Sequence, residues 1–442
     1  MTNDLTSLSR RTLLASLGGV ALAGLTLRAP VHAAAPRKTL TLRATMGQTI
    51  LRAGGEPVAR PVLALAEAVA LQRGDEVSVR FENELKQPAL LSWRGLDGVA
   101  AAEPLVGRQP VPPGGHDSFV LPLRSAGTLL ADLRLLADAG PSPMPALPLV
   151  VREATPPQVD GDELVLIEDA RLGKDGQPLA AGVDSGDTPW LYTINGKPTA
   201  DIALRANGRL RLRVINACQR NVIALKIDDH DVRVIALDSQ PAEPFLARGG
   251  TLVLAPGGRV DALIDATRPP GSTSAVNLLD GGKPIPIARL VYSGEPPLRG
   301  APLPLPTPLP DSGLPAQLPL GSALRVELPL GALTSAQLDW FAPGKFTPAS
   351  GPAFQVKRGR TVVLALTNRA TQPIVFHLHG HHFRLLDRLD DGWKPFWLDT
   401  LAIDAGQTQR IAFAAEHPGL WLIEAMAAKW SAPRLLRSYL VS

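Results

Sequence analysis

The stretch His377-Leu378-His379-Gly380-His381-His382-Phe383 contains four imidazole side chains and is the most informative part of the chain. Alternate residues of a β-strand face the same way, so His377, His379 and His381 are predicted to share one face. Neutral imidazole is a common ligand of copper and zinc. The run therefore indicates a candidate metal site, provided that other segments supply further ligands.

Short alternating segments upstream of this run predict an all-β fold. Residues 76–81, 210–215 and 361–366 have the two-residue period of strands, and Gly, Pro, Asn or Asp punctuates them. The 442 residues include 40 Gly and 43 Pro, and long helical periodicity is almost absent. This combination favours β-sandwiches or barrels, and the length indicates more than one domain.

The His-Leu-His-Gly-His motif resembles the C-terminal motif of the multicopper oxidases. Further segments resemble that family along most of the chain, namely residues 73–85, 110–115, 192–197, 213–217 and 254–261. The resemblance implies three consecutive cupredoxin-like Greek-key β-sandwich domains. We expect them at residues 36–155, 156–297 and 321–442. A Pro-rich linker is expected at 298–320, where a central strand cannot form.

Residues 1–35 are predicted to be a targeting segment. Ser9-Arg10-Arg11-Thr12-Leu13-Leu14 precedes a short apolar stretch that ends in small residues, which resembles a twin-arginine signal peptide cleaved at about residues 33–35. The stretch is short and contains Gly, so this interpretation is preferred to a membrane anchor. The predicted location is the periplasm, the twin-arginine translocase is the partner during export, and no later segment is expected to span a membrane.

Net charge and cysteine content argue against a nucleic-acid-binding protein and against a disulfide-stabilised one. The net charge of +4 falls to about +2 when residues 1–33 are removed, because they contain three Arg and one Asp. So small a charge does not indicate a nucleic-acid partner. Cys218 is the only cysteine, so an intrachain disulfide is impossible. We expect Cys218 to be a small buried residue rather than a copper ligand.

The resemblance implies where the ligands of a trinuclear copper cluster would fall. The family uses four His-x-His pairs, and His377 and His379 retain the third pair. The other six positions hold Ser92, Arg94, Asp132, Arg134, Glu424 and Met426. Two of the eight implied cluster positions are therefore histidine.

The resemblance also implies a separate type 1 copper site. Its four ligand positions fall on Ile374, Ala425, Trp430 and approximately Leu435. A blue copper site needs a cysteine thiolate, and none of these residues provides one. We therefore expect no catalytic residues of the full blue-copper oxidase mechanism.

The residues at the implied cluster positions include two cations and two carboxylates. We predict that they form a buried structural cluster with His377 and His379 that joins the first and third domains, through Ser92, Arg94, Asp132, Arg134, Glu424 and Met426. The alternative is one residual copper or zinc ion at His377, His379 and His381. Further donors for that ion would come from His382, Met426, Asp132 or Glu424.

Three function classes follow from this interpretation. The preferred class is a non-catalytic periplasmic scaffold that binds an unidentified protein partner, similar to the copper-free cell-division homologue of the multicopper oxidases. The second is a copper-handling protein with a mononuclear site, and the third is a copper-binding oxidoreductase. An aromatic segment at Trp393, Phe396 and Trp397 is either a recognition patch or packing at a sandwich end.

Overall fold

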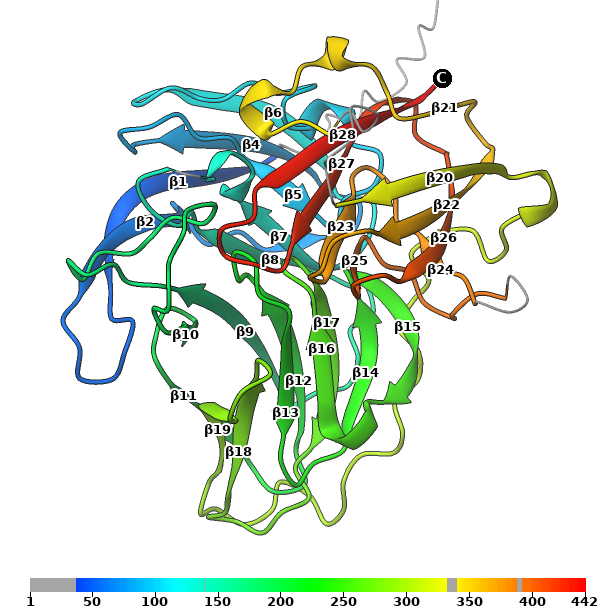
Figure 1. The fold of residues 1–442 in the computed structure, drawn as a ribbon. Helices are drawn as coiled ribbons and strands as arrows, with labels where there is room; N and C mark the ends of the chain where they lie inside the picture. Colours follow the sequence, from blue (N-terminus) through cyan, green and yellow to red (C-terminus); the bar gives the residue numbers. More distant parts are fainter. Residues whose placement is uncertain (1–36, 139, 332–339, 388–391) are drawn as a thin grey trace, which may run out of the picture. The chain divides into compact units, whose positions relative to one another are not determined.

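The computed structural model describes residues 37–138, 140–331, 340–387 and 392–442, and the predicted signal segment lies outside these residues. Strands make up nearly all regular structure in the described ranges, which confirms the predicted all-β class (Figure 1). No described helix is long and apolar enough to cross a membrane. The described 3-10 turns are η1 (Ala100–Ala102), η2 (Arg134–Leu136), η3 (Arg248–Gly250), η4 (Leu320–Ser322), η5 (Pro343–Lys345) and η6 (Pro348–Ser350).

The first β-sandwich pairs a sheet of order β2-β1-β4-β6 with a sheet of order β3-β8-β7-β5. Its strands are β1 (Lys38–Thr49), β2 (Val58–Leu65), β3 (Leu71–Gln72), β4 (Glu76–Asn83), β5 (Ser92–Arg94), β6 (His116–Pro122), β7 (Gly127–Asp132) and β8 (Ala146–Arg152). Val77, Val79 and Phe81 of β4 point into a core shared by both sheets. The alternation seen in the sequence therefore defines the buried face of this strand.

The second β-sandwich pairs sheets of order β10-β9-β12-β17-β14-β15 and β11-β19-β18-β13-β16. Its strands are β9 (Gly161–Ala170), β10 (Leu191–Ile194), β11 (Ala200–Leu204), β12 (Arg209–Asn216), β13 (Ile223–Ile227), β14 (Val232–Leu237), β15 (Gln240–Leu246), β16 (Thr251–Leu254), β17 (Arg259–Asp265), β18 (Thr273–Leu279) and β19 (Ile285–Tyr292). Every residue of β12 is buried. One face packs in the core, and the other places Arg213 against Thr128 of the first sandwich.

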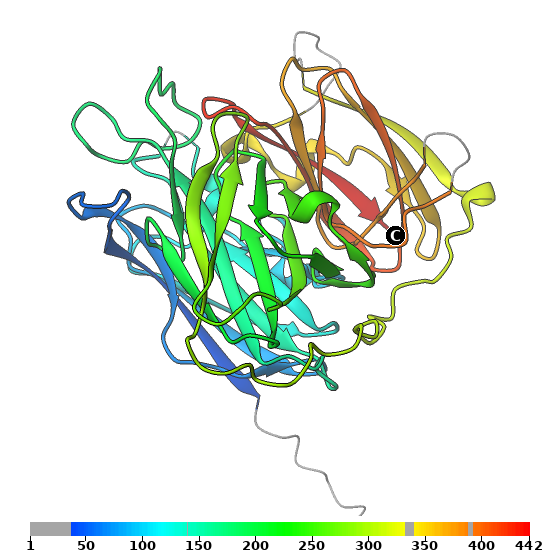
Figure 2. The same ribbon diagram turned by 90° about the horizontal axis from the view of Figure 1, so that it is seen from below.

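The third β-sandwich pairs sheets of order β20-β22-β26-β24 and β21-β28-β27-β23-β25. Its strands are β20 (Leu324–Leu330), β21 (Gln355–Val356), β22 (Thr361–Asn368), β23 (Ile374–Leu378), β24 (Arg384–Leu385), β25 (Thr400–Ile403), β26 (Thr408–Ala414), β27 (Gly419–Ala427) and β28 (Arg434–Val441). Figures 1 and 2 show the C-terminal strand β28 among the strands of this sandwich. Neighbours in each sheet are often distant in sequence, as in a Greek key, and three consecutive cupredoxin-like sandwiches are confirmed.

The Pro-rich segment between β19 and β20 contains no strand and packs against the second and third sandwiches. Arg209 donates hydrogen bonds to the carbonyl oxygens of Leu303 and Pro304, at 3.1 and 2.8 Å. Leu309 and Leu318 are buried in separate apolar clusters. The segment is therefore held in place along its length, whereas the domain boundaries drawn from the sequence stay predictions.

Candidate functional site

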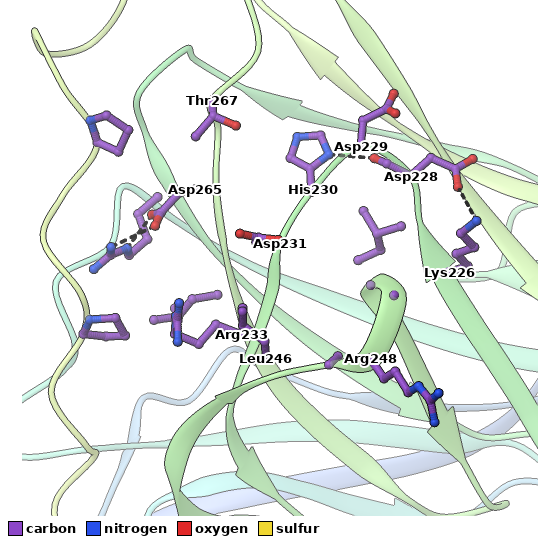
Figure 3. Close-up of a pocket in the computed structure, with 18 of the residues that line it drawn as sticks. Lys226, Asp228, Asp229, His230, Asp231, Arg233, Leu246, Arg248, Asp265 and Thr267 are labelled. Atoms are coloured by element: carbon purple, nitrogen blue, oxygen red, sulfur yellow. Dashed lines mark hydrogen bonds and ion pairs between the residues drawn. The ribbon is translucent and has the colours of Figure 1, made fainter.

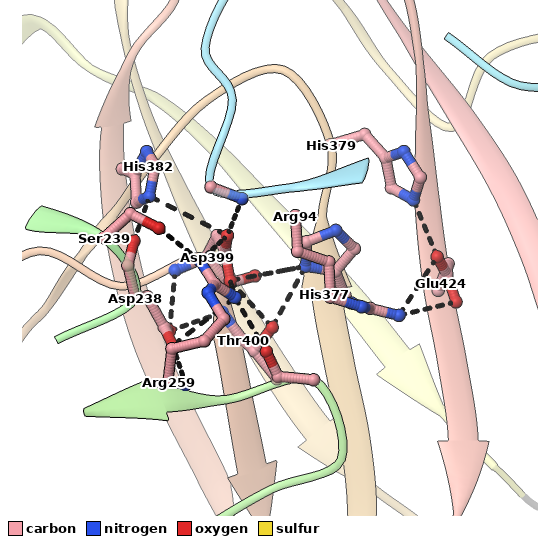
Figure 4. Close-up of polar contacts among 12 residues, drawn as sticks. Arg94, Asp238, Ser239, Arg259, His377, His379, His382, Asp399, Thr400 and Glu424 are labelled. Carbon is pink, nitrogen blue, oxygen red and sulfur yellow. Dashed lines mark hydrogen bonds and ion pairs between the residues drawn. The ribbon is translucent and has the colours of Figure 1, made fainter. Parts of the chain in front are cut away.

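Four segments meet where the first and third sandwiches face each other, and Figure 4 shows Arg94, His379 and Glu424 from three of them. Ser92 on β5 lies opposite Asp132 on β7, and His377 on β23 lies opposite Glu424 on β27. The two-residue period of a strand then places Arg94 beside Ser92 and His379 beside His377 on the facing sides. The resemblance places the four implied ligand pairs on these segments.

Arg94 connects the two sandwiches at this place. Its side chain is 3% exposed, its Nε lies 3.5 Å from Asp132 Oδ2, and its Nη2 lies 3.3 Å from Glu424 Oε2. Asp132 also accepts a hydrogen bond from Arg134 Nη2 at 2.9 Å and one from the Arg134 main chain at 3.0 Å. The structure thus brings Arg94, Asp132, Arg134 and Glu424 together.

Glu424 forms ion pairs with cations from three segments. His379 Nε2 lies 2.8 Å from its Oε1, Arg94 lies on its other side, and Arg434 of β28 forms a short ion pair with Oε2. His379 Nδ1 lies 3.0 Å from Glu103 Oε1. We call this set the Arg94–Glu424 cluster, which consists of Arg94, Glu103, Asp132, Arg134, His379, Glu424 and Arg434.

His377 and His379 differ in protonation. Burial lowers the pKa of His379, but Glu103 and Glu424 outweigh that effect and raise its pKa to about 9. His379 is therefore an imidazolium that donates from both ring nitrogens. Burial and the nearby Arg94 hold the pKa of His377 well below its usual value, so His377 is neutral.

Three other predicted site residues lie apart from these ion pairs. Ser92 is buried, and its Oγ has no hydrogen-bond partner among the described residues. Met426 packs in an apolar cluster with Ala255 and Val375. Strand β23 ends at Leu378 and Gly380 has a φ of 74°, so the alternation stops before His381. His381 Nδ1 instead lies 2.7 Å from the Tyr439 hydroxyl.

A second polar centre joins all three sandwiches and was not predicted from the sequence. Asp399 accepts the Gly95 N–H at 2.8 Å and both terminal nitrogens of Arg259, at 3.0 and 2.7 Å (Figure 4). Gly95, Arg259 and Asp399 belong to the first, second and third sandwich, respectively. This planar two-bond pairing is the strongest geometry available to an arginine and a carboxylate. We call the group formed by Gly95, Asp238, Arg259, His382 and Asp399 the Asp399 joint.

Asp238 and His382 complete the Asp399 joint. Asp238 Oδ2 accepts the main-chain N–H groups of Asp399 and Thr400, each at 3.1 Å. His382 donates to Asp97 Oδ2 and to the Asp238 carbonyl oxygen, each at 2.7 Å. Burial lowers the pKa of His382, but Asp97 and Asp399 outweigh it and raise the pKa to about 9. Both ring nitrogens therefore donate.

Some of the missed residues left a signal in the sequence. Glu103 follows the apolar segment 99–102, and a single charge in such a segment indicates a buried partner. Arg259 and Asp261 stand out in the sequence only as part of segment 254–261, which resembles the family. Asp399 follows Trp397-Leu398 without any motif, because its partners come from distant parts of the chain.

The side chains present are poorly suited to coordinate copper. Ligand atoms of His377, His379 and Glu424 lie within 4.8 Å of one another. However, His379 offers no lone pair while it is an imidazolium, and Glu424 is already paired with two arginines. Of these three residues, only His377 offers a neutral donor atom, its buried Nε2, that has no hydrogen-bond partner among the described residues. These residues do not fit a copper cluster in their present arrangement.

A cavity of about 920 Å³ lies at one end of the second sandwich (Figure 3). Its charged groups are largely paired, as Arg209 with Asp265 at 2.6 Å and Lys226 with Asp228 at 3.4 Å. His230 Nε2 lies 2.6 Å from the Tyr292 hydroxyl. Cations and carboxylates balance in the lining, so the cavity indicates no particular ligand.

The remaining candidates are explained by packing. Trp397 is 6% exposed and packs with Leu318, while the Arg384 guanidinium lies 4.7 Å from its ring centroid. Phe396 stacks on Phe245 at a centroid distance of 6.3 Å. Cys218 is fully buried in the second core, and burial raises the pKa of its thiol. The aromatic segment therefore connects elements of the fold.

We expect Asp132→Ala to lower the free energy of unfolding by about 3 kcal/mol, because it leaves Arg94 and Arg134 with a lost buried partner. Chemical denaturation measures this loss. Asp201→Ala is the matched control, since Asp201 forms an exposed pair with Arg289 at 2.7 Å and should leave the midpoint nearly unchanged. Equal effects of the two substitutions would contradict a buried ionic role for Asp132.

Asp169 on β9 predicts a pH dependence. Burial raises its pKa to about 7, and its Oδ2 has no partner among the described residues. The folded state thus binds a proton that the unfolded state has lost above about pH 4, so this contribution to stability falls as pH rises from about 4 to 7. We expect Asp169→Asn to remove that fall. Parallel stability curves for both proteins would contradict this.

Three consecutive cupredoxin-like sandwiches with a polar centre at their junction define the class of multidomain cupredoxin proteins. Family models described as "Multicopper oxidase" match residues 165–287 and 325–442. The chain belongs to the multicopper oxidase family. A solved multicopper oxidase from Pseudomonas thermotolerans has a TM-score of 0.76 and 24% identity, covering 92% of this chain and 100% of that one, and shows the shared fold.

Curated relatives include both oxidases and cell-division proteins. "Multicopper oxidase MmcO" of Mycobacterium tuberculosis is 25% identical over 79% of this chain and 76% of its own length. "Cell division protein FtsP" of Sodalis glossinidius is 28% identical over 46% of this chain and 45% of its own length. "Laccase-2" of Oryza sativa is 27% identical over 51% and 44%. The chain thus spans less than half of the last two relatives.

Proposed function

We propose that this protein is a non-catalytic member of the multicopper oxidase family that has lost its type 1 site and most of its trinuclear site. Its role is that of an exported scaffold that binds another protein. The observation that supports this most is the position of Arg94, whose guanidinium lies within 3.5 Å of Asp132 and Glu424, where the resemblance places metal ligands. A fixed cation beside these donors disfavours a bound metal cation.

The residues at the implied type 1 positions support the same conclusion. Ile374 and Ala425 lie in the third core, and Trp430 donates its indole N–H to the Ala180 carbonyl oxygen at 2.9 Å. None offers a copper donor, and electron entry through a copper thiolate needs a cysteine. The relatives named cell division protein FtsP support a role outside oxidation for this chain.

Metal analysis of the exported protein tests this proposal. We expect less than stoichiometric copper after expression with added copper, no blue absorption band, and the same melting curve before and after chelation. Mass spectrometry measures the metal, and a laccase assay provides the activity control. Four coppers per chain or laccase turnover would refute the proposal.

A copper-handling protein is the second candidate. The buried Nε2 of His377 favours it, because it has no hydrogen-bond partner in the part of the chain that the structure describes, and a neutral imidazole held this way is a metal donor. It predicts one metal ion per chain and a melting temperature that falls on chelation. His377→Ala should then abolish both effects.

The proposed location is the periplasm, through the twin-arginine segment at residues 9–14. Replacement of Arg10 and Arg11 by lysine should retain the protein in the cytoplasm, as cell fractionation would detect. Export of the lysine variant at the normal level would contradict this route. The protein partner would be sought with the exported form.

A further inference from the structure

Arg94 lies within the Arg94–Glu424 cluster and contacts carboxylates from two other segments, Asp132 of β7 and Glu424 of β27. Its Nε is 3.5 Å from Asp132 Oδ2, and its Nη2 is 3.3 and 3.4 Å from the two carboxylate oxygens of Glu424. Arg94 itself extends from the segment that holds the first implied ligand pair. Its positive charge is thus placed where carboxylates and imidazoles of the other segments converge.

The Arg94 guanidinium is better placed for ionic attraction to carboxylates than for forming hydrogen bonds. Arg94 Nε and Nη1 are buried and have no hydrogen-bond partner within the described ranges. A buried arginine placed for its donor geometry normally uses its planar fork in paired bonds, as Arg259 does with Asp399. Arg94 therefore serves mainly as a cation between two carboxylates.

His377 is oriented as metal-binding histidines usually are. Its Nδ1 donates to the main-chain carbonyl oxygen of Asp399 at 2.9 Å, which leaves the lone pair on Nε2. That Nε2 is buried and has no partner among the described residues. A backbone carbonyl on the opposite ring nitrogen is the common way to fix a ligating imidazole.

The second sandwich closes the space around Arg94. A Cβ added at Gly257, which has a φ of 92°, would lie 2.6 Å from Arg94 Nε and 2.7 Å from its Cδ. Main chain therefore packs directly against the guanidinium. A metal ion and the Arg94 side chain would compete for the same room as well as for the same carboxylate.

We propose that Arg94 is a resident cation that takes the place of a metal ion, and that removing its charge restores a site for one divalent transition-metal ion at His377, His379 and Glu424. This inference rests on the proposed function, since it assumes that the native chain holds no copper cluster there. Imidazole and carboxylate donors suit Zn²⁺, which prefers four ligands. Arg94→His supplies a fourth donor and removes the fixed charge.

Zinc binding to the full chain tests this inference. We compare the native protein, Arg94→Lys, Arg94→Gln and Arg94→His by calorimetric titration with Zn²⁺ and by thermal melting. Arg94→His is expected to bind one Zn²⁺ and to melt at a higher temperature with zinc, and Arg94→Gln is expected to do so more weakly. The native protein and Arg94→Lys should show neither effect. Adding His377→Ala to Arg94→His should abolish the zinc-dependent rise.

The outcomes separate this inference from the proposed function. If neither Arg94→His nor Arg94→Gln binds zinc and the native protein holds no metal, the inference is overturned and the proposed function stands. A His377-dependent zinc shift in the native protein would overturn the inference and support the copper-handling candidate. If the two variants fold poorly, zinc during refolding should recover folded protein, and recovery that is independent of zinc would also overturn the inference.

Discussion

Asp399→Ala is expected to lower the free energy of unfolding by about 5 kcal/mol, at the upper end of the losses seen when one partner of a buried ion pair is removed. The Asp399 side chain is 4% exposed and its partner Arg259 is fully buried. The substitution leaves the Arg259 charge without its paired acceptor and the Gly95 N–H without any carboxylate. Chemical denaturation followed by tryptophan fluorescence measures the loss.

The same substitution should also change how the protein unfolds. Asp399 accepts hydrogen bonds from Gly95 of the first sandwich and from Arg259 of the second, whereas each of the three largest apolar clusters lies within a single sandwich. We therefore expect the sandwiches of Asp399→Ala to separate before their cores melt, as two transitions. Asp399→Asn is the matched control, because it keeps the volume and removes the charge. If Asp399→Asn is as stable as the native protein, the ionic explanation is wrong.

The local part of the site was accessible from the sequence because strand geometry is local. The alternation of Ser92 with Arg94 and of His377 with His379 fixes which side chains share a face, and the family segments indicate which strands lie opposite. That was sufficient to group Arg94, Asp132, Arg134 and Glu424. The same rule does not extend to His381, because the chain turns at Gly380.

The partners that complete the site depend on tertiary packing. Glu103 raises the pKa of His379 together with Glu424, and Arg434 forms a further ion pair with Glu424. Neither residue belongs to a strand pair that the motif identifies. The alternating arginines of β12 illustrate the same limit, since a polar face on a strand predicts solvent, yet Arg211 and Arg213 are buried against the first sandwich. The two-residue period of a strand does not by itself show whether solvent or another sandwich covers its polar face.

Glu424→Gln is expected to cost about 4 kcal/mol, because three cations lose their shared carboxylate in a buried site. Glu424 is 4% exposed and pairs with Arg94, His379 and Arg434. The amide keeps the volume and one acceptor oxygen, so the loss reports charge rather than a cavity. Differential scanning calorimetry and denaturant titration would measure it, and a loss below about 1 kcal/mol, typical of exposed pairs, would contradict the assignment.

A double-mutant cycle separates the pair from its surroundings. Arg94→Gln alone leaves Glu424 with Arg434 and His379, while Asp132 keeps Arg134. Glu424→Gln alone leaves one excess positive charge in the cluster. In the double variant Arg94→Gln removes that excess charge. We expect the double variant to lose about 2 kcal/mol less free energy of unfolding than the sum of the losses of the two single variants, as for contacting charges. Additive losses would mean that Arg94 and Glu424 do not act as a pair, and would also weaken the inference that Arg94 stands in for a metal ion.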